Sequence, residues 1–377
     1  MNNPIRDTKT LRVAVAGGGT GGHLFPGLAV ARKLVERHPR ASVLFVTDRR
    51  GMESRILISS GFQRTFVKVE GLKGRGVLQG LAVMAMLPSA LYQACGILRR
   101  FGADAVLGVG GYSAGPVCAA ARLLGIPVVI HEQNSLPGLT NKWLSRVAER
   151  VLISFEESRS GFPAGKTVFT GNPVREEILE AAAEKNARGE LAILVVGGSQ
   201  GAAAVNTAVV ESMEILAGEG RRFQVMHQTG ESDYQRVAEA YRRIGLEARV
   251  FPFIEDMAQA YASSDLVVSR AGAGTVAELA AVGKPSVLIP YPYSANDHQV
   301  KNARVLADAG GAEILLQADL TGGSLADTLR RLDEERGRLA DMGKMASRMS
   351  RPEAADAIVD QLEAVIRAGN TRRGESP

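Results

Sequence analysis

Apolar residues in this chain gather in short continuous runs, and four of these runs end in a cluster of glycines. The runs and the clusters that follow them lie at residues 11–16 and 17–23, 105–107 and 108–113, 191–196 and 197–201, and 266–268 and 269–275. A segment of helical length and pattern comes after each cluster. Each cluster is therefore predicted to be a turn that joins a buried strand to the N-terminus of a helix.

The alternation of strand-like and helix-like segments predicts two doubly wound, Rossmann-like α/β domains, each with a parallel sheet and right-handed crossovers. The predicted strands lie at residues 11–16, 42–47, 64–69, 105–109, 127–130, 191–196, 223–227, 248–251, 266–269 and 286–290. Turn residues at 171–173 mark the join. We expect an N-terminal domain at residues 1–173, a C-terminal domain at 174–350, and a final helix with a loose polar tail in 351–377. The tail is expected at 371–377, and a return of the helix to the N-terminal domain is one alternative.

The four glycine turns have the geometry of anion-binding sites. The first N–H groups of a helix lack partners within the helix, and the helix dipole adds about half a positive charge at that end. A duplicated set of such turns predicts two nucleotide-binding folds that face each other across a cleft holding phosphate.

The first glycine turn also permits a different function. Gly17, Gly19 and Gly22 match the dinucleotide fingerprint G-x-G-x-x-G, and Asp48 ends the second strand, where an acid can bind ribose. A nicotinamide-dependent oxidoreductase is therefore an alternative. His23 lies at the start of the following helix, where the dipole favours the neutral imidazole that can act as a base. The competing interpretation is that His23 only completes the turn.

The fourth glycine turn leads into Thr275 and Glu278, which have the spacing of a capping box. Reciprocal capping of the helix would explain both residues without a ligand. The small residues before Thr275 instead suit a diphosphate, and Glu278, one turn further on, is placed to accept hydrogen bonds from ribose hydroxyls. Spacing alone leaves both interpretations open.

Polar loops follow one strand in each half of the chain. Residues 131–134 (HEQN) come after the strand at 127–130, and residues 296–299 (NDHQ) come after the strand at 286–290. Doubly wound sheets bind ligands at this carboxyl edge, and amides supply the donors and acceptors that sugar hydroxyls need. A purely structural loop is the alternative for each.

Composition narrows the range of partners. The chain has 45 Lys and Arg against 40 Asp and Glu, a net charge of +5, and its basic residues are scattered. We therefore expect an anionic surface or substrate and no nucleic acid. The two cysteines predict no disulfide framework. The five histidines lack ligand spacing and no Asp-x-Asp pair occurs, so we expect no metal or other cofactor. Helix ends and Arg175 would then stabilise a departing diphosphate.

Residues 76–98 form an uncharged stretch between Lys73 and Arg75 on one side and Arg99 and Arg100 on the other. The stretch would just cross a bilayer core of about 30 Å. Its proline, its glutamines and its position between strands of one sheet favour a pair of helices packed on the sheet instead. A third interpretation is an apolar surface with a basic rim that rests on an anionic membrane.

These motifs together resemble the MurG family of glycosyltransferases. The motifs that carry the resemblance are, in chain order, GGGTGGHLFPGLAVA, GVGGYSAGP, HEQNSLPGLTNKWL, GNPVR, VVGGSQGA, SRAGAGTVAEL and DHQVKNA. The family transfers N-acetylglucosamine from UDP to the muramyl sugar of undecaprenyl-diphosphate-linked muramyl pentapeptide, which converts lipid I to lipid II in peptidoglycan synthesis. The resemblance implies a hexosyltransferase of the two-domain GT-B class that inverts the anomeric centre and uses no metal.

Carried over position by position, the resemblance assigns Glu278 to the ribose, Ser199 to the diphosphate and the backbone of Ile254 to uracil. Asn134 and Gln299 would meet the sugar. The implied donor-binding set is Thr20, Gly21, Gly22, Asn134, Arg175, Ser199, Ile254, Ala273, Gly274, Thr275, Val276, Ala277, Glu278 and Gln299. The candidates for the acceptor diphosphate are Gly18, Gly110 and Tyr112.

The resemblance also makes His23 the candidate general base and implies a peripheral protein on the cytoplasmic face of the bacterial inner membrane. Its partners would be UDP-N-acetylglucosamine, the lipid-linked acceptor and an anionic membrane surface, with other cell-wall or division proteins as further candidates. The family's membrane patch is often rich in aromatic residues, whereas residues 76–98 contain only Tyr92. A non-catalytic membrane-surface scaffold that keeps a nucleotide fold is a second alternative.

Overall fold

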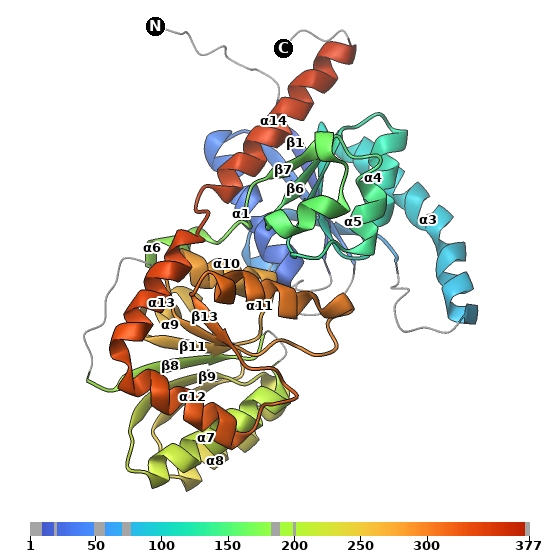
Figure 1. The fold of residues 1–377 in the computed structure, drawn as a ribbon. Coiled ribbons are helices and arrows are strands. Elements are labelled where there is room, and N and C mark those ends of the chain that lie inside the picture. Colours follow the sequence, from blue (N-terminus) through green and yellow to red (C-terminus); the bar gives the residue numbers. More distant parts are fainter. Residues whose placement is uncertain are drawn as a thin grey trace, which may run out of the picture. The chain divides into compact units, whose positions relative to one another are not determined.

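The chain divides into two compact units in the computed structural model (Figure 1). The first domain comprises Met1–Pro173 together with Glu353–Pro377, and the second domain comprises Val174–Pro352. The structure describes residues 10–18, 21–48, 57–69, 77–181, 189–198 and 201–373. The final segment of the chain therefore belongs to the first domain.

The described part of the first domain contains a seven-stranded parallel sheet with the order β3-β2-β1-β4-β5-β6-β7. The strands are β1 (Arg12–Gly17), β2 (Ser42–Thr47), β3 (Gln63–Phe66), β4 (Ala105–Gly110), β5 (Val128–Glu132), β6 (Arg150–Ile153) and β7 (Thr167–Phe169). β1 and β4 are neighbours although β2 and β3 lie between them in the sequence. Their pairing shifts register between Ala16 and Gly17.

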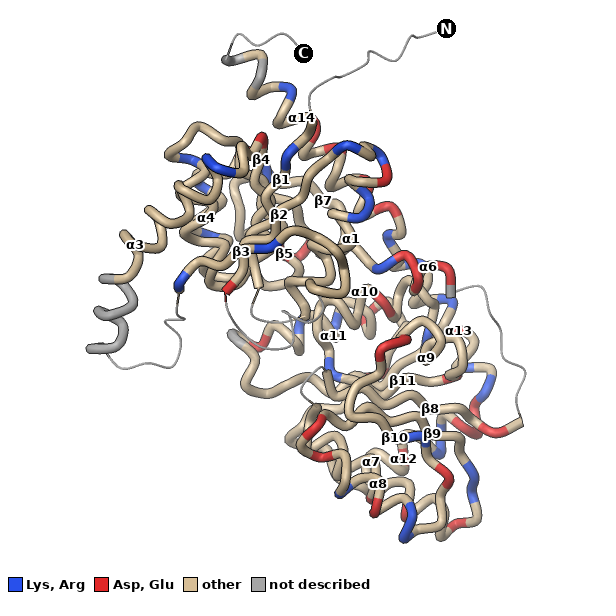
Figure 2. The backbone as a smooth tube through the Cα atoms, turned by 180° about the vertical axis from the view of Figure 1, so that it is seen from behind, with Lys and Arg blue, Asp and Glu red and all other residues tan. Residues whose placement is uncertain are grey.

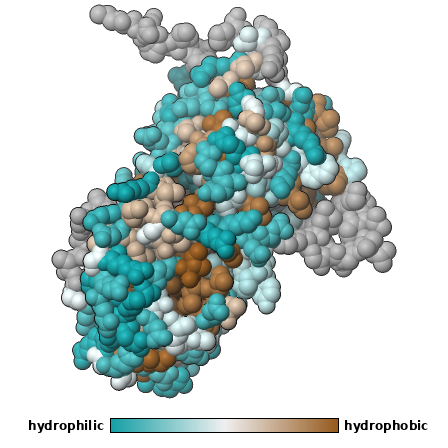
Figure 3. Space-filling view, viewed as in Figure 1, coloured by the Kyte–Doolittle hydropathy of each residue, from teal (hydrophilic) through white to brown (hydrophobic). Residues whose placement is uncertain are grey.

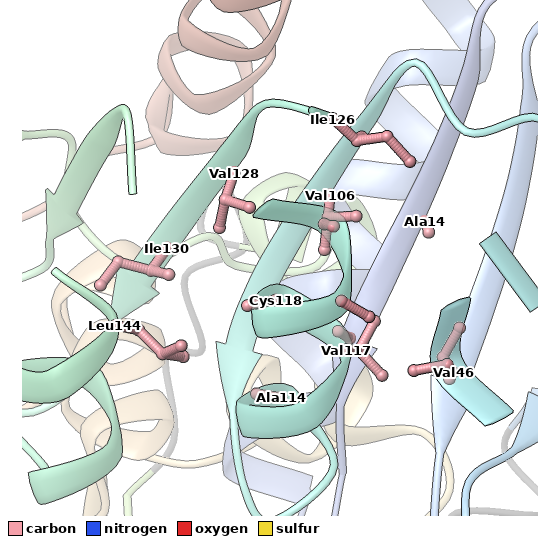
Figure 4. Close-up of a cluster of buried hydrophobic side chains, with 14 of the residues drawn as sticks. Ala14, Val46, Val106, Ala114, Val117, Cys118, Ile126, Val128, Ile130 and Leu144 are labelled. Carbon is pink, nitrogen blue, oxygen red and sulfur yellow. The ribbon is translucent and has the colours of Figure 1, made fainter. Parts of the chain in front are cut away.

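Helices cover both faces of this sheet. They are α1 (Gly21–Arg37), α3 (Val77–Phe101), α4 (Ala114–Leu123), α5 (Leu139–Leu144) and α14 (Ala354–Arg373). Successive strand residues point to opposite faces, so Ala14 packs under α3, α4 and α5, whereas Val13 and Val15 pack under α1 and α14. Figure 4 shows Ala114, Val117 and Cys118 of α4 together with Val106, Val128 and Ile130 of the strands in the first of these cores.

The last helix, α14, is anchored by both apolar and charged contacts. Ile358, Val359 and Leu362 are buried in the core beneath α1 and α14. The Arg37 guanidinium pairs with Asp356 at 2.6 Å and with Asp360 at 2.5 Å. The final helix therefore packs on the first domain, which is the alternative in which it returns to that domain.

The described part of the second domain contains a six-stranded parallel sheet with the order β10-β9-β8-β11-β12-β13. Its strands are β8 (Leu191–Val196), β9 (Phe223–Gln228), β10 (Ala248–Phe251), β11 (Leu266–Ser269), β12 (Ser286–Leu288) and β13 (Ala312–Ile314). Its helices are α6 (Glu176–Ala181), α7 (Ala203–Gly218), α8 (Tyr234–Arg243), α9 (Met257–Ala262), α10 (Ala273–Val282), α11 (His298–Asp308), α12 (Gly322–Glu334) and α13 (Arg336–Arg348).

The predicted fold class is confirmed, because both domains are parallel, doubly wound α/β units. The strands at 42–47, 191–196, 248–251 and 266–269 lie at their predicted bounds. β6, β7 and β13 were not predicted, because strands this short give no clear pattern. Basic and acidic residues are interspersed along both domains (Figure 2), as their scatter in the sequence suggested.

Two predicted segments need correction. Residues 77–101 form the single helix α3, not a helix pair, although Pro88 lies inside it. A proline removes one helical hydrogen bond, but Ala90, Ala94 and Leu98, one turn apart, are buried on one face and fix the C-terminal half. The prediction of a loose tail at 371–377 is also partly wrong, because α14 continues to Arg373. The rest of that predicted tail, residues 374–377, lies outside the described residues.

Within the described residues, no helix is both long enough and apolar enough to span a lipid bilayer.

Candidate functional site

The four glycine turns lie at the one position in each sheet where the strand order reverses. In the first domain the turns follow β1 and β4, and in the second domain they follow β8 and β11. These strands are adjacent, and in both sheets the chain proceeds outward from them in opposite directions. Such a switch point leaves a crevice at the carboxyl edge, which is where doubly wound sheets bind ligands.

In the first domain the two glycine turns pack directly against each other. A Cβ atom added to Gly111 would lie 2.0 Å from the Gly18 oxygen, and one added to Gly17 would lie 2.6 Å from the Gly110 oxygen. Gly110 and Gly111 also have φ values of +94° and +83°. The contact between the turns therefore requires glycine at Gly17 and Gly111, so a ligand is not needed to explain these two glycines.

His23 lies against this contact. It is the third residue of α1, and its ring atoms Cε1 and Nδ1 would be 3.1 and 3.2 Å from a Cβ atom on Gly110. Gly21 and Gly22 open the same helix, and Tyr112, which follows the second turn, is partly exposed. The structure thus brings His23, Gly18 and Gly110 together, whereas Thr20 lies outside the described residues.

The loop after β5 is mostly an internal scaffold. His131 is fully buried, its Nδ1 accepts from Gln133 Nε2 at 3.1 Å, and its Nε2 donates to the Gly171 oxygen at 3.1 Å. These partners assign the neutral tautomer with the proton on Nε2. Burial lowers the pKa of His131 to about 4, which agrees with a neutral ring. The expectation that the whole HEQN segment faces a sugar is therefore too broad.

Glu132 fixes the backbone around Asn134. One carboxylate oxygen accepts from the Asn134 backbone N–H at 3.0 Å and from its Nδ2 at 3.2 Å. The other accepts from the Gly138 N–H at 3.0 Å and from Asn141 Nδ2 at 2.9 Å. Glu132 is buried, whereas Asn134 is only partly buried. Asn134 is the one residue of the HEQN segment that is not fully buried.

In the second domain, Thr275 and Glu278 do not form a capping box. α10 begins at Ala273 after Gly272, with no side-chain cap. The Glu278 carboxylate instead accepts hydrogen bonds from Tyr261 Oη at 3.0 Å and from Arg175 Nη2 at 3.3 Å. The capping interpretation of this pair is wrong, because Thr275 lies inside the helix and Glu278 is held by side chains from elsewhere in the domain.

The N-terminus of α10 has open space in front of it. A Cβ atom added to Gly274 would meet nothing within 4 Å, and one added to Gly272 would meet only Thr275 Oγ1 at 3.6 Å. Ala273 and Gly274 are the first two residues of the helix, so their N–H groups have no partner within it. Val276 differs, because its side chain is buried and its N–H donates to the Gly272 oxygen at 2.9 Å.

Gln228 connects two other parts of the second-domain edge. Its Nε2 donates to the Gly198 oxygen at 3.0 Å, and its Oε1 accepts from the Ile254 backbone N–H at 2.8 Å. The Ile254 backbone N–H is thus already used within the protein. Ser199 lies outside the described residues.

The loop before α11 has an unusual backbone. Asn296 and Asp297 have φ values of 52° and 55°, a left-handed conformation that costs free energy in non-glycine residues. Gln299, in the first turn of α11, accepts from the Tyr291 N–H through Oε1 at 2.9 Å. This bond folds the loop back over the end of β12.

No group of three or more histidine, cysteine, aspartate or glutamate side chains is placed to hold a metal ion in the part of the chain that the structure describes.

Comparison with known proteins agrees with this architecture. Residues 13–153 match the glycosyltransferase family 28 N-terminal domain, and residues 192–358 match the family 28 C-terminal domain. The UDP-N-acetylglucosamine–N-acetylmuramyl-(pentapeptide) pyrophosphoryl-undecaprenol N-acetylglucosamine transferase of Myxococcus xanthus is 46% identical over 93% of this chain and 92% of that protein. The protein of the same name from Syntrophus aciditrophicus is 45% identical over 95% and 99%.

A solved structure gives the same result. The crystal structure of Acinetobacter baumannii MurG is 35% identical, covers 94% of this chain and 99% of its own, and superposes with a TM-score of 0.75. The two Rossmann-like domains and these matches define a glycosyltransferase of the GT-B class. Within that class, the chain belongs to the MurG family. Neither the oxidoreductase nor the scaffold alternative is supported by these relatives.

Three further side chains were not predicted from the sequence. Tyr261 and Gln228 hold candidate residues through hydrogen bonds, and Trp143 is an exposed aromatic side chain on α5. The Tyr261 and Gln228 contacts join elements far apart in sequence and have no local signal. Trp143 is the only tryptophan of the chain, and its position after two polar residues could have drawn attention to it.

The variant Gly274→Ala tests whether the N-terminus of α10 binds a ligand or only serves the fold. The new methyl group would enter open space, and alanine in place of a helical glycine stabilises by up to about 1 kcal/mol, so thermal stability should not fall. If a diphosphate approaches this turn, affinity for UDP should drop about tenfold or more by titration calorimetry.

Gly337→Ala is the matched control, because Gly337 is also the second residue of a helix, α13, with nothing within 4 Å of an added Cβ atom. Equal UDP affinity in both variants and the parent would contradict a diphosphate site at α10.

Proposed function

We propose that this chain transfers N-acetylglucosamine from UDP-N-acetylglucosamine to the muramyl sugar of undecaprenyl-diphosphate-linked muramyl pentapeptide, with inversion at the anomeric carbon and without a metal ion. The relatives that are 45 and 46% identical carry the name of this reaction. The observation that carries the proposal is the Arg175–Glu278 pair beside the open N-terminus of α10. It combines a carboxylate for hydroxyl groups with backbone donors for phosphate.

The second domain is proposed to bind the donor. The N-terminus of α10, with Ala273, Gly274 and Thr275, offers backbone N–H groups and the positive end of the helix dipole to the diphosphate. Glu278 accepts from the ribose hydroxyls, and the carbonyl of Ile254 accepts from the uracil ring. The remaining proposed donor contacts are Thr20, Gly21, Gly22, Asn134, Arg175, Ser199, Ala277 and Gln299.

Val276 is proposed to act through the backbone of α10 only. Its side chain lies in the core and its N–H is bonded to Gly272, so it supports the helix end without touching the donor.

The first domain is proposed to supply the base and the acceptor contacts. His23 removes the proton from the acceptor's sugar hydroxyl, and the oxygen attacks the anomeric carbon from the face opposite UDP. The new glycosidic bond forms as the bond to the diphosphate oxygen breaks, and UDP leaves with the electron pair. Gly18, Gly110 and Tyr112 are proposed to face the acceptor diphosphate.

The outer surface of α3, α4 and α5 is proposed to contact an anionic membrane. Tyr92, Leu123, Leu139 and Trp143 are 83, 69, 71 and 67% exposed and come from this layer of helices. The neighbouring basic residues of the same segments are Arg99, Arg100, Arg122, Lys142 and Arg146. Figure 3 shows apolar side chains among hydrophilic ones on the side of the first domain where α4 lies.

Trp143 supplies an aromatic anchor in addition to Tyr92 of α3. The Arg146 guanidinium lies 4.5 Å from the centre of its ring, so a cation and an aromatic side chain are presented together. Amphipathic surfaces of this kind bind at the interface of a bilayer with acidic lipids. This supports a peripheral position on an anionic membrane surface, which we propose to be the cytoplasmic face of the inner membrane.

A transfer assay tests the reaction itself. With radiolabelled UDP-N-acetylglucosamine and a lipid-linked muramyl acceptor, we expect one sugar to be transferred per acceptor. The rate should be unchanged by a chelator of divalent cations, because helix N-termini and side chains carry the charge of the leaving group. Loss of turnover on chelation, with recovery on adding magnesium or manganese, would overturn the metal-independent mechanism.

His23→Ala tests the proposed base. Removal of a general base costs about 10²- to 10⁴-fold in turnover, while UDP affinity should change little. His38→Ala is the control, because His38 follows the same helix at its other end and pairs with Glu363 on α14. A loss of less than a few-fold in His23→Ala would remove His23 from the role.

Trp143 reports membrane contact directly, because no other tryptophan contributes to the fluorescence. Its emission should shift to shorter wavelength with vesicles that contain anionic phospholipid, and the shift should shrink in high salt as the Debye length falls from about 10 Å to about 3 Å. Neutral vesicles are the control. An unchanged spectrum with anionic vesicles would contradict contact at α5.

A further inference from the structure

Tyr261 is a buried tyrosine whose hydroxyl group has one charged partner. It lies in α9, its residue is 1% exposed, and its Oη donates to Glu278 Oε2 at 3.0 Å. The contact joins α9 to the second turn of α10. A hydrogen bond between a buried hydroxyl and a carboxylate is among the stronger bonds that neutral donors form.

The Glu278 carboxylate is held at both of its oxygens. Tyr261 donates to Oε2, and Arg175 Nη2 donates to Oε1 at 3.3 Å. The side chain of Glu278 nevertheless remains 16% exposed. A carboxylate oxygen accepts about two hydrogen bonds, so each oxygen keeps capacity for one more.

Two fixed acceptor oxygens match a ligand with two adjacent hydroxyl groups. The 2′ and 3′ hydroxyls of ribose are such a pair, and each can donate to one oxygen. If the carboxylate could rotate freely, part of the binding free energy would be lost in ordering it. The pinned orientation removes that cost before the ligand arrives.

The state of the Tyr261 hydroxyl supports this role. Burial raises its pKa well above the usual value, and the neighbouring Glu278 charge raises it further. The hydroxyl therefore keeps its proton, and donates it to Glu278, at every pH at which the protein works.

We propose that Tyr261 is a positioning residue for nucleoside recognition, which orients the Glu278 carboxylate for the two ribose hydroxyls of the donor without touching the donor itself. The proposal rests on the proposed ribose contact of Glu278. The chemical group that depends on the Tyr261 hydroxyl, through Glu278, is then the 2′,3′-diol of the ribose.

Tyr261→Phe removes one oxygen and keeps the ring in the core. We expect the dissociation constant of UDP, measured by calorimetry, to rise about 3- to 10-fold, and KM for the donor sugar to rise with little change in kcat. The affinity for 2′,3′-dideoxyuridine diphosphate should be the same in the variant and the parent, because that ligand lacks the hydroxyls that Glu278 would bind.

Tyr241→Phe is the matched control. Tyr241 is a second buried tyrosine of the same domain, 1% exposed, and its hydroxyl bonds to His227 Nδ1 at 2.9 Å, away from Glu278. This variant should bind both nucleotides like the parent. Thermal unfolding of both tyrosine variants shows whether any change in affinity follows from a loss of fold.

Glu278→Gln distinguishes the two levels of the proposal. If Glu278→Gln leaves UDP affinity unchanged, the proposed contact between Glu278 and ribose is wrong. The positioning role of Tyr261, which depends on that contact, is then wrong as well. If it weakens UDP binding but Tyr261→Phe does not, the ribose contact stands and the positioning role is overturned. Equal weakening of UDP and the dideoxy ligand in Tyr261→Phe would also overturn it, because the hydroxyl would then serve only the fold.

Discussion

The reversal of strand order in each parallel sheet is the constraint on which the sites depend. β1 and β4, and likewise β8 and β11, are adjacent strands from which the chain proceeds in opposite directions. The turns after these strands therefore meet at one edge, and each leads into a helix whose first N–H groups have no intrahelical partner. His23, Gly110 and Thr275 lie in or after such turns, whereas Asn134, Ile254 and Gln299 follow β5, β10 and β12 at the carboxyl edges of the same sheets.

The two domains use similar glycine turns for different physical purposes. In the first domain, Gly17 and Gly111 allow two turns to touch, and a Cβ atom at either position would collide with the backbone of the other turn. In the second domain, Gly274 faces open space, so the protein itself does not require glycine there. Gly337 at the N-terminus of α13 also faces open space, so the open space at Gly274 indicates a ligand only together with its position after β11 at the switch point. This contrast favours the second domain as the site of the diphosphate.

The sequence predicted the central strands well because they are buried on both faces and read as continuous apolar runs, as at 42–47 and 191–196. It predicted α10 but not the partners of Glu278, because capping-box spacing is a local signal and the contacts with Tyr261 and Arg175 are not. The internal hydrogen bonds of His131 and Glu132 could not be predicted from the sequence either. Polar residues after a strand give the same sequence pattern whether they contact a ligand or the protein itself. The exposure of Trp143 was not predicted, because a single aromatic residue on a short helix gives no hydrophobic pattern.

The pairing of Arg175 with Glu278 bears on how charge is balanced when the donor binds. The pair is neutral as a unit, so it adds little net attraction for a diphosphate at a distance. Attraction must then come mainly from the N-terminus of α10, where about half a positive charge and free helical N–H groups are fixed in place. As negative charge grows on the departing phosphate oxygen, this dipole is already aligned and needs no reorganisation. Arg175 can strengthen that field only at short range, and in the proposed site its bond to Glu278 would keep the guanidinium beside the nucleoside end of the donor. Under that proposal, ribose recognition and leaving-group stabilisation are coupled through one ion pair.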